Sequence, residues 1–165
     1  MRRLNRPRHK WDDVVFLLVC TLVLFADQLS KIWIRANLPI GQSLFEIGFF
    51  RVIHIQNTGA AFGIFPDQPV ALTIISFIGA IALVLCALLS RRCLPFLDNM
   101  LGKSALGLVL GGTIGNLIDR FRFSYVTDFL DFGFWPTFNI ADSAVTIGVI
   151  IFAYYLFRLA QTARG

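Results

Sequence analysis

Long apolar segments alternate with shorter polar ones along this chain of 165 residues. Four of these segments reach the length that crosses a membrane, and they cover about residues 14–34, 69–90, 101–118 and 139–157. A hydrocarbon core of roughly 30 Å needs a helix of about 20 mostly apolar residues. The pattern therefore predicts an α-helical integral membrane protein with four transmembrane helices. We expect residues 1–165 to form a single membrane domain.

The loop between the first two predicted spans, about residues 35–68, has a different pattern. Residues 49–56 are rich in β-forming side chains that partly alternate with polar ones, and Gly41 and Gly48 punctuate the segment. Such a run predicts two short strands, which we expect to form a small β-sheet, a cradle at the membrane surface. The loop between the third and fourth spans, about residues 120–138, is instead rich in aromatic residues. Aromatic residues of this kind are typical of the headgroup level of a bilayer.

Composition and charge support a membrane protein and give it an orientation. Hydrophobic residues make up 56% of the chain and charged residues only 15%, whereas a soluble domain carries about 25% charged residues. Ten of the 15 Lys and Arg residues lie before the first span, in residues 91–103 or after residue 157. With four spans, these three segments lie on one side, which the positive-inside rule assigns to the cytoplasm. We therefore expect both termini to be cytoplasmic and the β-containing loop to be extracytoplasmic.

The basic N-terminal segment has two other interpretations. A basic arm can bind nucleic acid, but an apolar run follows this one at once, so we expect no nucleic-acid partner. A basic stretch before an apolar run also resembles a secretory signal peptide. However, no small-x-small cleavage site precedes Asp27, and three more apolar segments follow. We therefore interpret the run as a retained first span.

Polar residues collect at the ends of the spans that are predicted to face outward. Asp27 and Lys31 are four residues apart, so they share one helix face and could form an ion pair that reduces the cost of burying either charge. Asn116, Asp119 and Arg120 stand at helical spacings at the end of the third span. Asp119 and Arg120 could form an interfacial pair that reaches water. Asn116 is harder to explain in this way, because an amide in lipid needs a hydrogen-bonding partner.

Two further acids follow, and a pair of carboxyl groups suggests a reaction. Asp128 lies in the aromatic loop, where a single acid is usually solvated, and Asn139 is typical of a helix N-cap. A cap explains Asp142 less well, because Asp142 lies inside the predicted span, where a carboxylate is a functional candidate by default. Two carboxyl groups close together in a low-dielectric site cannot both ionise easily, so one keeps a proton while the other can accept one from water. This is the chemistry of an aspartic protease.

Other hydrolytic chemistries lack their residues. The sequence contains no His-Glu-x-x-His motif, no Cys/His cluster with metal-ligand spacing and no Gly-x-Ser-x-Gly motif. These are the patterns typical of zinc peptidases, metal sites and serine hydrolases. We therefore expect neither a metal nor a cofactor.

Five short motifs follow one another along the chain: Asp27-Gln28-x-x-Lys31, residues 56–62 (QNTGAAF), Gly115-Asn116-x-x-Asp119-Arg120, Val126-x-Asp128-Phe129 and Phe138-Asn139-x-Ala141-Asp142-Ser143. In this order, on a chain with four spans, they resemble the motifs of the lipoprotein signal peptidases, also called signal peptidase II, which are membrane aspartic proteases of bacteria. The resemblance covers nearly the whole chain.

The resemblance implies a role for each of these polar residues. It implies that the catalytic pair is Asp128 and Asp142. Residues that hold the site and the substrate backbone would be Asn57, Asn116, Arg120 and Asn139. Residues that give structural support would be Asp27, Lys31 and Asp119.

The resemblance also implies a substrate and a location. The substrate would be a prolipoprotein that carries diacylglycerol on a cysteine, and the enzyme would cut the peptide bond just before that cysteine. The site would lie at the extracytoplasmic surface of the bacterial inner membrane, in a multi-pass protein whose other partners are membrane lipids. Nothing in the sequence requires more than a monomer.

Two other functions fit part of the pattern. A small membrane transporter or proton-relay protein would also carry acids in its spans, but these acids would be distributed through the membrane depth, whereas here they cluster on one side. A non-enzymatic scaffold could use polar residues only to join its helices. The transporter predicts flux and no peptide product, and the scaffold predicts that replacing either acid by Asn leaves function intact.

Overall fold

The computed structural model describes residues 10–59, 68–93 and 99–162. The basic segment before residue 10 and motif residues 60–62 lie outside these ranges. Within them the chain forms four helices and three strands. In chain order these are α1 (Lys10–Asn37), β1 (Ser43–Ile47), β2 (Phe50–Asn57), α2 (Pro69–Cys93), α3 (Met100–Phe123), β3 (Val126–Asp131) and α4 (Ile140–Thr162).

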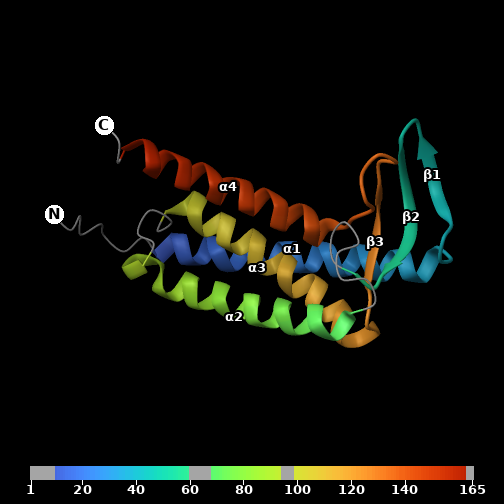
Figure 1. Ribbon diagram of the computed structural model, residues 1–165, viewed down its shortest axis with the longest axis horizontal. Coiled ribbons are helices and arrows are strands. Elements are labelled where there is room, and N and C mark those ends of the chain that lie inside the picture. The colour runs from blue at the N-terminus through green and yellow to red at the C-terminus, as the bar shows by residue number, and fades with distance from the viewer. Residues whose placement is uncertain (1–9, 60–67, 94–98, 163–165) are drawn as a thin grey trace.

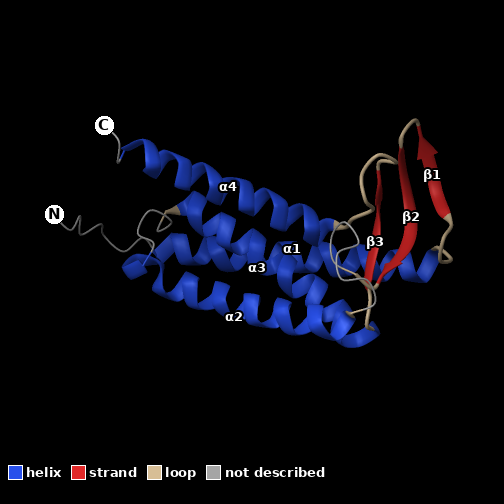
Figure 2. Cartoon of the chain, in the orientation of Figure 1, coloured by secondary structure: helices blue, strands red, loops and turns tan. Residues whose placement is uncertain are grey.

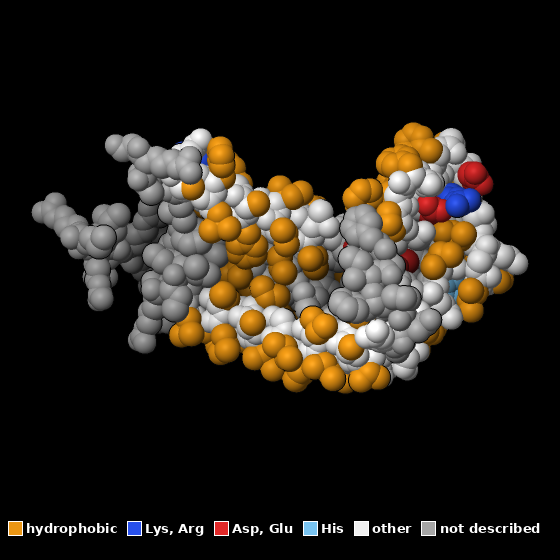
Figure 3. Space-filling model, in the orientation of Figure 1, with side chains coloured by type: hydrophobic (Ala, Val, Ile, Leu, Met, Phe, Trp, Pro, Cys, Tyr) orange, Lys and Arg blue, Asp and Glu red, His pale blue; other side chains and the backbone are white. Residues whose placement is uncertain are grey.

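The four helices run side by side as a bundle, and the sheet stands at one end of it (Figures 1 and 2). Each helix is long and apolar enough to cross a membrane, which confirms the predicted fold class. The helices extend beyond the predicted spans, except that the fourth begins at Ile140, so Asn139 precedes it. Apolar side chains cover the flank of the bundle (Figure 3), as expected for a surface that meets lipid rather than water.

Helix α3 is the central helix of the bundle. In its apolar stretch 67% of the residues are buried, against 17% or less in the other three helices. Glycines let the neighbouring backbones approach it closely, as is common between membrane helices. A Cβ at Gly111 would lie 2.7 Å from the backbone oxygen of Cys20 in α1, and one at Gly112 would overlap the backbone oxygen of Ala141 in α4. Polar groups near the ends of three helices are therefore brought within hydrogen-bonding distance.

The sheet is antiparallel, with the strand order β1-β2-β3. The predicted small sheet is therefore present, but it is built from two loops, because β3 comes from the loop between α3 and α4. The sequence predicted strands only in the loop between the first two spans, so the strand within the aromatic loop, which contains residues 126–129, was not predicted. Five of the six residues of β3 are buried, and a strand covered on both faces lacks the alternation by which strands are recognised in a sequence.

The last turns of α1 reach past the bundle and pack against the sheet (Figure 1). Ile34 and Leu38 of α1 form a buried apolar cluster with Phe129 of β3. This cluster fixes the strand that carries Asp128 against a helix of the membrane bundle.

The close contact between α3 and α4 leads to a prediction. Gly112→Ala would place a methyl group against the backbone of Ala141 and 2.9 Å from Val145 Cγ2. We expect this overpacking to lower the free energy of unfolding by about 1–3 kcal/mol. Thermal unfolding in detergent micelles would measure the loss. The control is Gly79→Ala in α2, where an added Cβ meets nothing within 4 Å, and equal stability of the two variants would contradict the prediction.

Candidate active site

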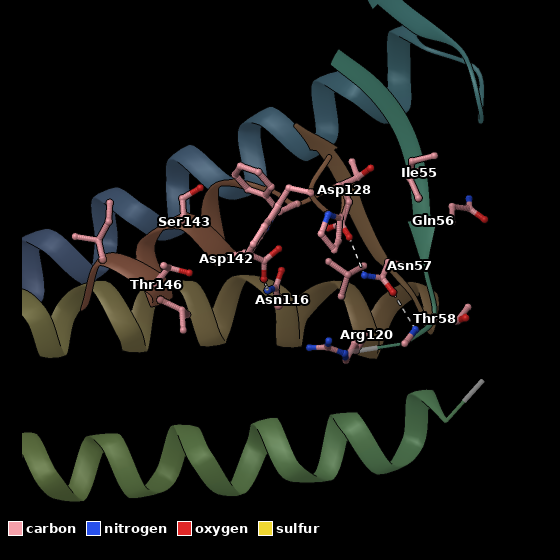
Figure 4. Close-up of a pocket in the computed structure, with 18 residues that line it drawn as sticks. Ile55, Gln56, Asn57, Thr58, Asn116, Arg120, Asp128, Asp142, Ser143 and Thr146 are labelled. Carbon is pink, nitrogen blue, oxygen red and sulfur yellow. Dashed lines mark hydrogen bonds between the residues drawn. The ribbon is translucent and has the colours of Figure 1, made fainter. Parts of the chain in front are cut away.

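A cavity of about 790 Å³ lies where the ends of α3 and α4 meet strands β2 and β3. Much of its lining is apolar, including Trp135, Val145 and Ile147. Five of the six residues predicted to be catalytic or to hold the substrate line it, and Figure 4 shows them around one space: Asn57, Asn116, Arg120, Asp128 and Asp142. The structure therefore brings together residues from four separate motif regions.

Asp128 lies in β3 and its side chain is almost fully buried, with 2% exposed. Its Oδ2 accepts a hydrogen bond from Asn57 Nδ2 at 2.8 Å, and its Oδ1 accepts one from Asn139 Nδ2 at 2.7 Å. Burial, together with the negative charge of Asp142, raises the pKa of Asp128 from 3.8 to about 7, although both amide donors and Lys31 act in the opposite direction. Near neutral pH, Asp128 therefore exists partly as the neutral acid, which can donate a proton.

Asp142 is held by the start of α4. Its backbone N–H donates to Asn139 Oδ1 at 3.0 Å, and its Oδ2 accepts from the backbone N–H of Asn139 at 3.2 Å. This reciprocal pair is a capping box. The expectation that a cap explains Asp142 less well than Asn139 is therefore wrong, because Asp142 is itself the second partner of the cap. As a result its carboxyl group lies at the positive end of the helix dipole, which favours an anion.

Two asparagine amides connect the acids. Asn139 Nδ2 donates to Asp128 Oδ1 and also lies 3.1 Å from Asn116 Oδ1. Asn116 Nδ2 donates to Asp142 Oδ1 at 2.7 Å. Asn139 does not line the cavity but lies behind it, where it is fully buried. The two carboxyl groups are thus parts of one hydrogen-bonded network.

Lys31 supplies the positive charge of this network. It is fully buried, and its Nζ lies 2.8 Å from Asn116 Oδ1 and 2.9 Å from Asp27 Oδ2. An ammonium group has only donors, so it fixes the carbonyl side of the Asn116 amide toward itself and leaves the NH₂ side for Asp142. Asp27 Oδ1 in turn accepts the backbone N–H of Ala141 at 3.0 Å. The Asp27–Lys31 ion pair is therefore present and joins α1 to both α3 and α4.

Asp119 and Arg120 do not form the interfacial pair considered above. Asp119 is fully buried and lies 3.6 Å from Lys31 Nζ and 3.3 Å from an N–H group of Arg35. Arg120 lines the cavity and donates to Ser76 Oγ in α2 at 3.4 Å. Arg35 was not among the predicted site residues. The available signal was its position four residues after Lys31, which puts both cations on one face of α1.

The groups around the two acids are hydrogen-bond donors rather than metal ligands. Among the described residues no cluster of three or more His, Cys, Asp and Glu side chains could hold a metal ion. The arrangement supplies one carboxyl with a proton, one carboxyl held by donors, and a cavity that can receive a peptide. These parts can activate water against a carbonyl group.

Comparison with known proteins gives consistent matches over most of the chain. The sequence model of a family described as signal peptidase (SPase) II matches residues 19–158. A lipoprotein signal peptidase from Dehalococcoides mccartyi is 52% identical over 137 residues, which cover 83% of this chain and 85% of the relative. A lipoprotein signal peptidase from Moorella thermoacetica is 47% identical over 143 residues, which cover 86% and 91%.

Solved structures show the same fold. A bacterial membrane enzyme determined by the in meso method at 2.3 Å resolution matches with a TM-score of 0.79 and 35% identity, over 88% of each chain. A second such enzyme, at 1.9 Å resolution, matches with a TM-score of 0.74 and 32% identity, over 93% of this chain and 97% of the other.

The buried position of Lys31 leads to a prediction for stability. Lys31→Met leaves Asp27 and Asp119 buried without their shared cation, and we expect a loss of about 3–5 kcal/mol in the free energy of unfolding. The double variant Asp27→Asn/Lys31→Met should lose less free energy of unfolding than the two single variants together, since no unpaired carboxylate remains at position 27. Thermal unfolding in detergent measures each loss. Arg122→Met, at an exposed position, is the control, and equal stability of Lys31→Met and this control would refute the prediction.

Proposed function

The chain belongs to the signal peptidase II family of membrane aspartic endopeptidases, and we propose that its catalytic pair is Asp128 and Asp142. Family membership favours an enzyme over the transporter, the proton-relay protein and the scaffold that the acids alone left open. The observation that carries the proposal is that both carboxyl groups line one cavity and are joined by the same asparagine network. The raised pKa of Asp128 supports it.

The proposed substrate is a diacylglyceryl-modified prolipoprotein, which is cut just before the lipidated cysteine. The names of the relatives support a lipoprotein substrate. The position of the cavity supports a substrate that carries a lipid, because the cavity lies at the end of the membrane bundle and its lining is largely apolar. A signal helix could remain in the bilayer while its end enters the space between α4 and the sheet.

The proposed reaction uses the two acids in complementary roles. Asp142 accepts hydrogen bonds from Asn116 and from the backbone of Asn139. It takes a proton from a water molecule while the oxygen of that water bonds to the scissile carbonyl carbon. Asp128 gives its proton to the carbonyl oxygen, forming a tetrahedral diol. When the C–N bond breaks, the leaving nitrogen takes the proton from Asp142, and Asp128 regains one from a hydroxyl group. Because the acids are coupled, their titration belongs to the pair.

Two other residues of the cavity are proposed to hold the substrate. Asn57 and Arg120 line the same space as the acids. Their N–H groups are suited to orient the substrate backbone and to stabilise the oxygen that gains negative charge during attack. Asp27, Lys31 and Asp119 are proposed to act only as support.

The family and the four spans place the protein in the bacterial inner membrane. We propose that both termini are cytoplasmic and that the site faces outward. The distribution of Lys and Arg supports this orientation, as does the fold, because α1 begins and α4 ends far from the sheet (Figure 1). We also propose that a monomer is sufficient, since residues of one chain surround the cavity.

The central prediction concerns the two acids. Asp128→Asn and Asp142→Asn should each remain folded and lose at least about a hundredfold in cleavage rate, because neither amide can exchange a proton with water. The measurement is the mass of the peptides released from a lipidated prolipoprotein, with the unlipidated form in parallel. Asp131→Asn is the control: it lies in the same strand but its carboxyl group binds Arg51 and the N–H of Gly133. Full cleavage by Asp142→Asn would sink the assignment.

The pKa of Asp128 leads to a second prediction. Cleavage should decline as the pH rises above about 7, because Asp128 then loses the proton that it must donate. The hydrogen bond from Asn57 lowers this pKa, so Asn57→Ala should move the alkaline limb of the pH–rate profile to higher pH. Asn37→Ala removes an exposed amide that, among the described residues, donates to the Trp33 carbonyl and not to Asp128, so it should leave the limb in place. A shift to lower pH in Asn57→Ala would contradict the prediction.

A further inference from the structure

A second polar cluster lies directly behind Asp128 and consists of Arg35, Asp119 and Thr127. Asp119 Oδ2 accepts the backbone N–H of Thr127 at 3.0 Å, and Arg35 donates to Thr127 Oγ1 at 2.9 Å. Arg35 also lies 3.3 Å from Asp119 Oδ1. Asp119 and Thr127 are fully buried. Since Thr127 is the residue immediately before Asp128, this cluster, which we call the Thr127 clamp, holds the backbone from which that carboxyl group extends.

We propose that Arg35 is a positioning residue for the reaction, which sets the location of Asp128 through the Thr127 clamp. The inference rests on the proposed function in one respect only, that Asp128 is catalytic. Arg35 itself does not line the cavity, so its effect on the reaction is indirect.

The pairing of β3 with β2 is irregular next to Asp128, so further contacts are required to fix the strand there. Val52 pairs with Leu130 and Ile55 pairs with Asp128, so the register shifts between these two pairs. Two residues of β2 then face the single residue Phe129, which is the arrangement of a β-bulge. The bulge interrupts the ladder at Phe129, directly after Asp128. The contacts of Thr127 with α1 and α3 lie on the other side of Asp128 and secure it there.

The position of Arg35 suits it to join three elements at one point. It stands near the end of α1, and its guanidinium group lies over the ring of Phe123 in α3, 4.6 Å from the ring centre. A guanidinium group is planar and has several fixed donors, so it can bind a carboxylate and a hydroxyl group at the same time. Lys31 approaches Asp119 Oδ2 at 3.6 Å. Without Arg35, Asp119 would be drawn toward Lys31, and the hydroxyl of Thr127 would lose its donor.

The consequence for catalysis is a change in the relative position of the two acids. Asp142 has contacts of its own that do not involve Arg35 or Asp119, namely its capping box with Asn139 and the hydrogen bond from Asn116. Loosening the Thr127 clamp therefore displaces Asp128 more than Asp142, because only Asp128 extends from the clamped backbone. A misplacement of about 1 Å between reacting groups can cost about a hundredfold in rate. Substrate binding should change little, because the residues that line the cavity remain.

The test compares Arg35→Gln with Arg122→Gln. Arg122 lies over the same Phe123 ring, 5.2 Å from its centre, but within the described residues it has no bond to Asp119 or Thr127. We expect Arg35→Gln to lower kcat per folded enzyme by about tenfold to a hundredfold, with KM changed less than twofold and kcat of Arg122→Gln unchanged. The folded fraction is taken from thermal unfolding in detergent, so a loss of folded protein is not counted as a loss of kcat.

Thr127 provides an independent arm of the test. Thr127→Val removes the hydroxyl group and should lower kcat, whereas Thr127→Ser keeps it and should retain kcat. The double variant Arg35→Gln/Thr127→Val should be no slower than the slower single variant, because both changes open the same clamp. Losses that multiply in the double variant, or equal kcat in Arg35→Gln and Arg122→Gln, would overturn the inference. Failure of the proposed function would instead appear as cleavage by Asp128→Asn.

Discussion

One buried ammonium group, that of Lys31, holds together the parts that meet at the active site. It binds Asp27 on its own helix and Asn116 on α3, and Asp27 binds the first turn of α4. Removing such a charge from water costs several kcal/mol, which only close partners can offset. The helices therefore meet in the one arrangement in which Lys31 has all its partners. The glycines of α3 permit this approach, and the ion pairs make it specific.

Lys31 is linked to Asp142 by hydrogen bonds through the neutral amide of Asn116. An asparagine amide has a donor side and an acceptor side. Lys31 donates to the oxygen of the Asn116 amide, so the NH₂ group of Asn116 points toward Asp142. A cation in direct contact would lower the pKa of a carboxyl group and keep it ionised. Amide donors fix the geometry with a weaker effect on charge. This suits the proposed catalytic pair, in which one member holds a proton.

The sequence was sufficient to predict the four helices, because long apolar runs and their charged ends are local features. Its motifs also contain the acids and amides that the structure brings together in and beside one cavity. It did not predict β3, whose buried residues lack alternation, or the capping role of Asp142, which was assigned to the interior of the span. Arg35 was missed for another reason: its partners Asp119 and Thr127 are 84 and 92 residues away. No local pattern shows which distant groups will meet a given cation.

The sheet is assembled from two loops that are far apart in the sequence, and this affects when the proposed active site is complete. Strands β1 and β2 are synthesised early, whereas β3 follows the third helix and Asp142 begins the last one. A nascent chain still entering the bilayer thus has Asn57 in place but neither acid beside it. Once β3 has been synthesised, it must pair with the edge of β2 before the cavity exists. The proposed catalytic pair is therefore complete only when the last helix has been synthesised and has reached the sheet.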